Sequence, residues 1–258
     1  MDLGLKARKA IVTGATRGIG RAIAQVLADE GCDIGICARD AASVEAAVAD
    51  LARRGVHATG RAVDVGDGAA LKAWIASAGR ELGGLDIVVS NVSAMGGIPG
   101  DEGWRRYFEI DIMGAVHAVE GALPLLEKSD AGAIVQVASI AAIEVGHDVF
   151  PDGYLQAYGA MKAALTNYMA ELSRTLGPKG IRANTVTPGQ IYFPGGVWHR
   201  REQAGDPMVA KALARIRLGR FGRPEDVARA VAFLASPAAG FVSGANLVID
   251  GAFTRRVN

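Results

Sequence analysis

The chain has 258 residues, 50% of them hydrophobic, and its 28 Lys and Arg residues nearly balance its 27 Asp and Glu residues for a net charge of +1. This balance argues against a nucleic-acid partner, which usually requires a basic stripe, and no apolar run is long enough to cross a membrane. The N-terminus does not resemble a signal peptide, so we expect a cytoplasmic protein in which both cysteines, Cys32 and Cys37, are reduced thiols.

Short β-rich apolar runs alternate with longer helical patterns along the whole chain. In chain order the sequence predicts a strand at 9–14, a helix at 18–31, a strand at 32–38, a helix at 41–55, a strand at 57–65, a helix at 70–82, a strand at 85–91, a helix at about 101–127, a strand at 132–139, a helix at about 154–176, and strands at 181–189 and 246–250. Regular alternation predicts an α/β fold with a parallel sheet covered on both faces. The strands are almost continuously apolar, as expected for strands buried on both sides.

No internal repeat, low-complexity tract or linker divides the chain. We therefore predict a single domain over residues 1–258. Pro188 and Pro194 bracket a region, roughly 189–206, that we expect to be irregular.

A glycine-rich turn follows the first predicted strand. The segment "TGATRGIG", residues 13–20, places Gly14, Gly18 and Gly20 between a strand and a helix. A turn this tight needs glycine where φ is positive or where the backbone must approach a ligand. The helix beginning there offers free N–H groups and partial positive charge to a pyrophosphate. Although the spacing is GxxxGxG rather than the commoner GxGxxG, the position favours nucleotide binding.

The end of the second predicted strand indicates whether the bound nucleotide is NAD(H) or NADP(H). NAD-binding proteins usually carry an acid there to hold the ribose hydroxyl, but the sequence "ICARD" places Ala38 and Arg39 there, and we expect Asp40 to cap the next helix. Arg17 lies inside the glycine turn. Two guanidinium groups favour a 2′-phosphate, so we predict that NADP(H) is preferred and that NAD(H) is possible. The alternative is that both arginines are solvated surface residues.

Tyr158 and Lys162 lie four residues apart on one face of a predicted helix. A phenol with a pKa of about 10 is a poor acid or base at neutral pH unless its phenolate is stabilised. An ammonium ~4 Å away would contribute about 4 kcal/mol at an effective dielectric of about 20. Tyr154 has Tyr158 rather than a lysine four residues later, so it lacks this help. A lone YxxxK match nevertheless occurs often by chance.

Further motifs occur in order with this pair. They are "TGATRGIG", "VDV" at 63–65, Ser139 at the end of the fifth strand, "YGAMK", "IRANTVTPG", "GRFGRPEDVA" and the terminal "FVSGANLVIDGA", in which Ala252 stands where a second glycine is more usual. Together they resemble the short-chain dehydrogenase/reductase family over essentially the whole chain. The resemblance implies a Rossmann-type doubly wound parallel sheet of about seven strands and an NADP(H)-dependent oxidoreductase that interconverts a ketone and a secondary alcohol by hydride transfer. It also implies a homotetramer, assembled through the long helices after the fourth and fifth strands and the C-terminal segment.

The resemblance also assigns roles to individual residues. Tyr158 is similar to the general acid/base, Ser139 to the donor that holds the carbonyl oxygen, and Lys162 to the residue that lowers the tyrosine pKa and binds the nicotinamide ribose. Asp111 stands where the family has a catalytic asparagine. No metal is implied. The implied cofactor-binding residues, besides Tyr158 and Lys162, are Gly14, Thr16, Arg17, Gly18, Ile19, Gly20, Arg39, Asp64, Val65, Asn91, Pro188, Gly189 and Ile191.

Three departures from the family pattern concern the catalytic region. The segment after the fourth strand is "SNVS", residues 90–93, where the family usually has "NNAG". The asparagine position, now Asp111, contributes a helix irregularity in the family; aspartate could preserve it, while its charge could support or compete with the pairing of Lys162 to Tyr158. The stretch 139–158 is longer than usual and contains His147, Phe150 and Tyr154. We expect His147 to be a solvent-exposed loop residue.

A fourth departure is Phe193, where the family often has threonine. With Tyr192 and Trp198 it predicts an aromatic flap, within about 189–217, over a pocket suited to an apolar or cyclic ketone or alcohol. The alternative is that these rings fill a small local core. His199 is expected at the surface.

Other functions remain open at this point. A 3-oxoacyl-[acyl-carrier-protein] reductase shares nearly all these motifs, and a catalytically silent cofactor-binding protein would keep the fold. The joint presence of Ser139, Tyr158 and Lys162 argues against the silent alternative. A hydrolase of the GxSxG type is disfavoured because the chain has no such motif.

Overall fold

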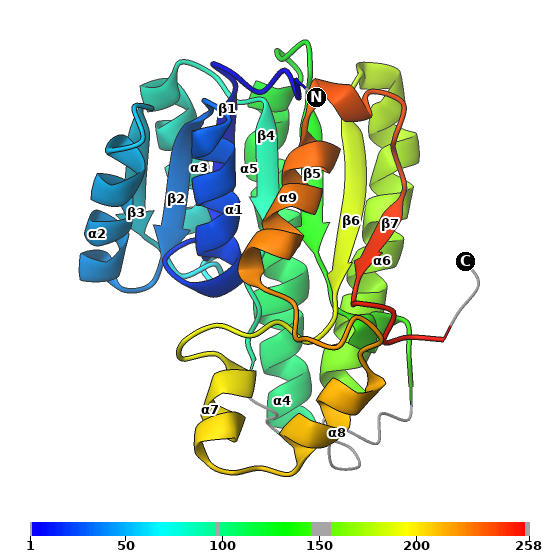
Figure 1. The fold of residues 1–258 in the computed structure, drawn as a ribbon. Coiled ribbons are helices and arrows are strands. Elements are labelled where there is room, and N and C mark those ends of the chain that lie inside the picture. The colour runs from blue at the N-terminus through cyan, green and yellow to red at the C-terminus, as the bar shows by residue number, and fades with distance from the viewer. Residues whose placement is uncertain (1, 96–98, 146–155, 256–258) are drawn as a thin grey trace.

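A parallel β-sheet forms the centre of the molecule (Figure 1). The computed structural model describes residues 2–95, 99–145 and 156–255. Its seven strands lie in the order β3-β2-β1-β4-β5-β6-β7, and every neighbouring pair is parallel. They are β1 (Lys9–Thr13), β2 (Asp33–Ala38), β3 (Ala58–Ala62), β4 (Ile87–Ser90), β5 (Ala133–Val137), β6 (Arg182–Pro188) and β7 (Asn246–Ile249). The predicted Rossmann-type doubly wound fold is confirmed.

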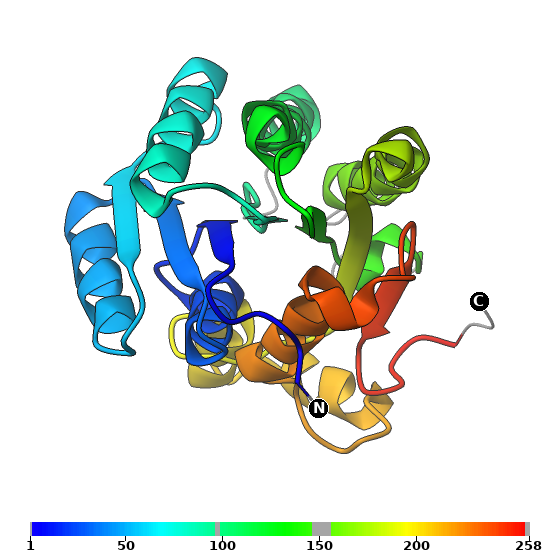
Figure 2. The same ribbon diagram turned by 90° about the horizontal axis from the view of Figure 1, so that it is seen from above.

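Helices cover both faces of the sheet, as the view from above shows (Figure 2). On one face lie α1 (Gly18–Asp29), α2 (Ala41–Ala52) and α9 (Pro224–Ala235); on the other lie α3 (Gly68–Leu82), α5 (Gly114–Leu126) and α6 (Gln156–Leu176). Each set of helices buries a separate apolar core against the sheet. Among the described residues, no helix is long and apolar enough to span a membrane.

The alternation of side chains along the strands produces these two cores. In β1, Ile11 belongs to one core and Val12 to the other; in β4, Val88 and Val89 divide in the same way. Successive residues of a strand point to opposite faces of the sheet. A strand that is buried on both faces therefore needs apolar residues at consecutive positions, which explains the continuous apolar runs in the sequence.

The strand order reverses at β1, which pairs with β2 on one side and β4 on the other. The connections leaving these strands turn to opposite faces, and a crevice opens at the carboxyl ends between them, where ligands of open α/β sheets bind. The glycine turn follows β1 at this edge, so the topology places it beside the crevice.

The helix predicted at about 101–127 is interrupted. It consists of α4 (Gly100–Tyr107), a π-helical turn η1 (Phe108–Met113) and α5. A π-helical turn inserts an extra residue into the helical path and redirects a side chain, and such turns are frequent at functional sites. Asp111 lies within this turn and is buried.

The region predicted to be irregular, 189–206, contains a helix, so that prediction is wrong for residues 197–203. Helices α7 (Val197–Gln203) and α8 (Met208–Arg215) lie below the carboxyl ends of the strands in Figure 1. They carry a third apolar cluster that includes Trp198, Ala212 and Phe253. Short 3₁₀ turns are found at η2 (Ile140–Ala142), η3 (Gly177–Lys179) and η4 (Pro237–Ala239).

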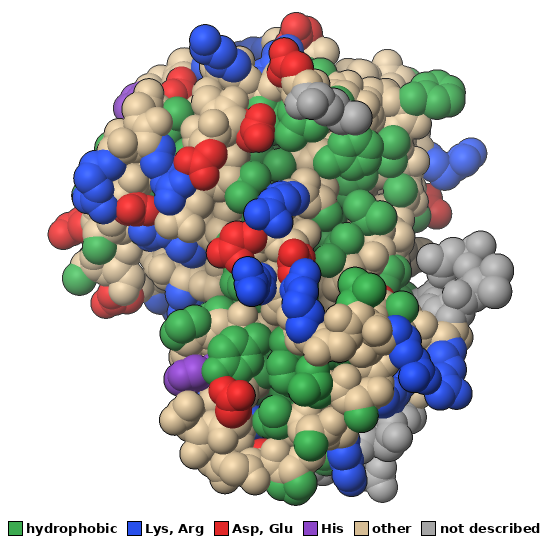
Figure 3. Space-filling view, in the orientation of Figure 1, with side chains coloured by type: hydrophobic (Ala, Val, Ile, Leu, Met, Phe, Trp, Pro, Cys, Tyr) green, Lys and Arg blue, Asp and Glu red, His purple; other side chains and the backbone are tan. Residues whose placement is uncertain are grey.

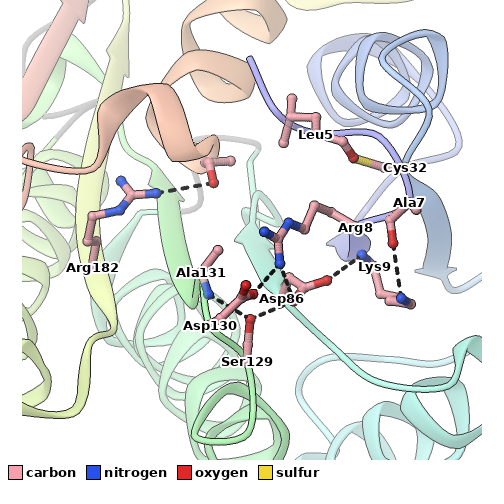
Figure 4. Close-up of polar contacts among 11 residues, drawn as sticks. Leu5, Ala7, Arg8, Lys9, Cys32, Asp86, Ser129, Asp130, Ala131 and Arg182 are labelled. Carbon is pink, nitrogen blue, oxygen red and sulfur yellow. Dashed lines mark hydrogen bonds and ion pairs between the residues drawn. The ribbon is translucent and has the colours of Figure 1, made fainter. Parts of the chain in front are cut away.

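A polar network ties the amino ends of the central strands together, at the edge opposite the glycine turn (Figure 4). Asp86 accepts hydrogen bonds from Lys9 N at 2.8 Å and from Ser129 Oγ at 2.5 Å, and Arg8 Nη1 lies 3.6 Å from its Oδ1. Arg8 also bonds to Asp130. The network joins the segments that begin β1, β4 and β5, and its place in the fold indicates a structural role.

Candidate active site

A cavity of about 650 Å³ opens at the carboxyl ends of the strands. Every catalytic or cofactor-binding residue that the sequence predicts lines it except Asp111, which is buried. The lining residues predicted from sequence are Gly14, Thr16, Arg17, Gly18, Ile19, Gly20, Arg39, Asp64, Val65, Asn91, Ser139, Tyr158, Lys162, Pro188, Gly189 and Ile191. The fold thus brings together residues from segments that are far apart in the sequence.

The glycine turn leaves no room for side chains. Gly14 and Gly18 have φ values of +67° and +54°, and a Cβ on Gly20 would lie 2.3 Å from Gly14 O. Asn91 Nδ2 donates to Thr13 O at 3.1 Å and to Gly14 O at 3.2 Å. Asn91 therefore holds the turn from the end of β4, and the turn presents bare backbone to the cavity.

Arg17 and Arg39 lie on the nucleotide side of this cavity. Arg17 is the residue before α1, Arg39 follows β2, and both are exposed. Within the described residues neither side chain has a hydrogen bond or an ion pair. Asp40 caps α2 as predicted, because its carboxylate accepts from Ser43 N at 2.8 Å; hydrogen bonding to Ser43 also lowers the pKa of Asp40.

The donor set and charge of the cavity fit a dinucleotide. Among the described residues, five cationic side chains and two acidic ones line it: Arg17, Arg39, Arg106, Lys162 and Arg200, with Asp40 and Asp64. Asp64 is itself engaged, since Gly66 N donates to its Oδ1 at 3.0 Å. A bare glycine backbone at a helix N-terminus next to unpaired guanidinium groups is suited to phosphate groups. No group of acidic, cysteine or histidine side chains within the described residues is arranged to hold a metal.

Tyr158 lies in the first turns of α6 and is partly exposed in the cavity. Its ring packs on that of Tyr107, with 5.7 Å between the ring centroids and 58° between the planes. Lys162 Nζ lies 5.7 Å from the centroid of the Tyr158 ring. The two residues are neighbours, as their spacing predicts, but the direct ionic partner of Lys162 is a different residue.

That partner is Asp111. Lys162 Nζ lies 3.0 Å from Asp111 Oδ1, and their side chains are only 2% and 0% exposed; the contact is an ion pair without hydrogen-bond geometry at Oδ1. Lys162 Nζ also donates to Val137 O at 3.5 Å. Burial pulls the pKa of Lys162 down, but the Asp111 carboxylate and the nearby tyrosines outweigh it, so the pKa lies above its usual value. Lys162 therefore remains a cation.

Asp111 also reaches the segment after β4. Its Oδ2 accepts from Ala94 N at 2.8 Å. One carboxylate thus fixes both Lys162 on α6 and the main chain that follows the unusual "SNVS" segment. The expected helix irregularity is present at Asp111, and the carboxylate of Asp111 is paired with Lys162.

Ser139 follows β5 and faces the same cavity. Its Oγ accepts from Ala141 N at 3.2 Å, at the start of η2. A serine hydroxyl has one donor and two acceptor positions. The bond to Ala141 uses an acceptor position and leaves the hydroxyl proton free for a ligand.

The aromatic residues of the flap divide between cavity and core. Phe193 and Trp198 line the cavity, whereas Tyr192 does not: it bonds to Glu202 and packs on Phe221, with 6.1 Å between ring centroids. Trp198 also packs on Phe221, at 5.2 Å. The expectation that Tyr192 lines the pocket is therefore wrong, because its hydroxyl finds a partner on α7.

Some predicted and some unpredicted residues remain to be placed. His147, Phe150 and Tyr154 lie outside the described residues. His199 is partly exposed, and its Nδ1 accepts from Gly195 N at 3.2 Å. Arg106 and Tyr107 line the cavity although the sequence did not single them out; Tyr107 lies four residues before Asp111, and this spacing was the available signal.

Comparison with known proteins agrees with this geometry. A family model described as enoyl-(acyl carrier protein) reductase matches residues 14–254. Isoepoxydon dehydrogenase patN of Penicillium expansum is 37% identical, with 97% of this chain and 96% of that protein covered. The chain belongs to the short-chain dehydrogenase/reductase family.

Two further matches describe relatives within this family. Cis-4-hydroxycyclohexanecarboxylate dehydrogenase of Sinomonas cyclohexanicum is 38% identical, with 96% of each chain covered. The crystal structure of L-sorbose reductase from Gluconobacter frateurii, complexed with NADPH and L-sorbose, superposes with a TM-score of 0.89 at 29% identity over 100% of both chains. The short-chain dehydrogenase/reductase described here is accordingly an oxidoreductase with a Rossmann-type fold.

Proposed function

We propose that the protein is an NADP(H)-dependent oxidoreductase that interconverts a ketone and a secondary alcohol. The observation that carries the proposal is the convergence of Ser139, Tyr158 and Lys162 on one cavity whose nucleotide side presents the bare glycine turn with Arg17 and Arg39. A proton donor, a second hydrogen-bond donor and a fixed cation are the protein groups that carbonyl reduction requires beside a hydride source.

The roles of the side chains follow from their contacts. Ser139 donates its free hydroxyl proton to the carbonyl oxygen and so positions it. Tyr158 transfers its phenolic proton to the same oxygen in reduction and recovers it in oxidation. Lys162 stabilises the resulting phenolate by its charge, and Asp111 holds the buried ammonium in place. The bound nicotinamide cofactor supplies or accepts the hydride.

The preference for NADP(H) rests on Arg17 and Arg39. Both guanidinium groups lack an acidic partner within the described residues, and the only acid that follows β2 directly, Asp40, is occupied in capping α2. The NADPH bound to L-sorbose reductase supports the same assignment. Changing Arg39 to Asp should raise the Michaelis constant for NADPH and lower that for NADH; an unchanged constant for NADPH would contradict the assignment.

The substrate side of the cavity favours a cyclic ketone or alcohol. Trp198 lines the cavity and packs in one apolar cluster with Ile140, the residue after Ser139, whereas the Phe193 ring lies against Gly18 of the glycine turn. Apolar pockets exclude water around the reacting carbon. The name of the Sinomonas relative, a hydroxycyclohexanecarboxylate dehydrogenase, points to a six-membered ring. We propose that residues 189–217 form the flap over this pocket, within a single domain over residues 1–258.

A spectrophotometric assay tests the proposal. NADPH and NADH oxidation would be followed with cyclohexanone, small polar ketones and an acetoacetyl thioester, the last representing the acyl-carrier-protein reductase alternative. Tyr158→Phe should lower kcat by ~10²-fold or more while NADPH binding, measured by fluorescence, is retained. Turnover by the Tyr158→Phe variant at the wild-type rate would overturn the assigned role, and a preference for small polar ketones would overturn the substrate class.

We also propose a homotetramer. Trp104 and Phe108 are 43% and 48% exposed at α4 and η1, and Leu247 on the edge strand β7 and Phe241 are exposed as well. Hydrophobic side chains gather over α9 and the neighbouring edge of the sheet (Figure 3). Exposed apolar patches of this kind are typical of interfaces. Light scattering coupled to size-exclusion chromatography would distinguish a tetramer from a dimer or a monomer.

A further inference from the structure

Arg106 lines the same cavity as Tyr158 and stands next in the chain to a residue that contacts this tyrosine. It belongs to the last turn of α4, and the next residue, Tyr107, packs its ring on Tyr158. Arg106 itself lines the cavity. Its position therefore differs from that of Arg17 and Arg39, which lie at the glycine turn and at the end of β2.

The guanidinium group of Arg106 has no partner among the described residues. Glu102 and Glu109 precede and follow it by one helical turn, yet neither forms an ion pair with it. Arg200, which lines the cavity from the flap, is engaged because it donates to Gly195 O. A guanidinium carries five N–H donors in a planar fork suited to a carboxylate, so Arg106 presents unused donors to a ligand.

The two acids in the described part of the cavity lining are engaged elsewhere. Asp40 caps α2 and Asp64 accepts from Gly66 N, both on the nucleotide side. Lys162 is balanced by Asp111. With Arg17 and Arg39 assigned to the cofactor phosphates, Arg106 remains as a cavity cation that has no anionic partner among the described residues.

We propose that Arg106 binds a carboxylate of the substrate, so that the preferred substrate is a ring ketone or alcohol that carries an acidic group away from the reacting carbon. The carboxylate is held by charge-assisted hydrogen bonds, which are stronger than neutral ones. This inference rests on the proposed function for the reaction at the carbonyl, but the binding step can be measured without turnover.

The first experiment measures binding of a probe that cannot react. Cyclohexanecarboxylate and the neutral cyclohexanecarboxamide would be titrated calorimetrically into the full-length protein, with and without NADP⁺. We expect wild type to bind the acid about tenfold more tightly than the amide, and Arg106→Gln to lose that preference. Arg105→Gln is the matched control, because Arg105 is exposed on the same helix but does not line the cavity; this variant should keep the preference.

The second experiment measures turnover. With 4-oxocyclohexanecarboxylate and cyclohexanone, Arg106→Gln should lower kcat/KM for the acid about tenfold relative to the neutral ketone, and Arg105→Gln should leave the ratio unchanged. The inference is overturned if wild type shows no preference for either charged compound, or if Arg106→Gln keeps it. If wild type binds cyclohexanecarboxylate through Arg106 but reduces neither ketone, the proposed reaction fails while the carboxylate site stands.

Discussion

The buried ion pair between Asp111 and Lys162 can be tested by changing Asp111 to Asn. Two unit charges 3.0 Å apart attract by about 5–6 kcal/mol at an effective dielectric of about 20. This attraction offsets the cost of burying each charge, which is several kcal/mol. Removing one partner leaves the other buried and uncompensated, so we expect Asp111→Asn to lower the free energy of unfolding by about 3–5 kcal/mol at pH 7.

The pH dependence of this loss is a sharper test. In the native protein the pKa of Lys162 is raised, so its stabilising contribution is present below the unfolded pKa and is lost only as the pH rises through the folded pKa. In the variant, burial of Lys162 is no longer opposed by Asp111, and its pKa should fall below the usual value. Stability of the variant should then rise with pH as Lys162 becomes neutral, and the gap to wild type should narrow between neutral pH and pH ~10.

Urea denaturation at fixed protein concentration, repeated across this pH range, measures both quantities. Asp130→Asn is a suitable control, since Asp130 pairs with Arg8 but its side chain is 80% exposed; exposed ion pairs contribute little. A loss for Asp111→Asn no larger than that of the control would refute the reasoning. A loss that stays constant with pH would refute the assignment to an uncompensated Lys162.

Three further outcomes follow from local geometry. Gly20→Ala should weaken NADPH binding at least tenfold in a fluorescence titration, because the added Cβ would lie 2.3 Å from Gly14 O. Gly177→Ala is the control and should bind NADPH normally, because the space around Gly177 is open. Equal affinities of the two variants would contradict a role of the glycine turn in binding the cofactor. Ala252→Gly should raise the free energy of unfolding by ~0.5 kcal/mol, because Ala252 has a φ of +59°. A left-handed backbone costs a non-glycine residue ~1–2 kcal/mol, and the greater freedom of glycine in the unfolded chain offsets part of this gain. Unchanged stability would show that the backbone at Ala252 is not strained. Cys32 and Cys37 should resist iodoacetamide at pH 8 until the protein is unfolded, because burial raises the pKa of each thiol to about 12; rapid modification of the native protein would refute their burial.

Much of the fold could be predicted because local patterns and tertiary burial agree. The apolar residues of the strands, such as those of "AIVQV" in β5, are buried, and Gly14 and Gly18 adopt the positive φ expected of a tight turn. Asp40 caps its helix as predicted. In each case a short stretch of sequence contains the physical cause of the structure.

The features that the sequence did not predict depend on contacts between distant segments of the chain. The sequence predicts an irregular path for residues 197–203, but α7 is stabilised by Trp198, which packs on Phe221 from a separate part of the chain. Tyr192 is predicted in the pocket and instead bonds to Glu202. Arg106 gives no signal in the sequence, because only the folded chain shows that it lines the cavity without an ionic partner among the described residues.

Two departures from the family pattern meet in one contact. The "SNVS" segment and the Asp111 position are about twenty residues apart and look independent in the sequence. In the folded chain Asp111 Oδ2 accepts from Ala94 N, the residue that follows this segment, while Oδ1 faces Lys162. A carboxylate can hold both groups, because one oxygen accepts the amide proton and the other faces the ammonium. Asparagine offers one oxygen and one NH₂, so it can serve only one of them well. The identity of residue 111 is therefore coupled to the cavity wall after β4, and the charge of Asp111 positions that wall as well as the lysine.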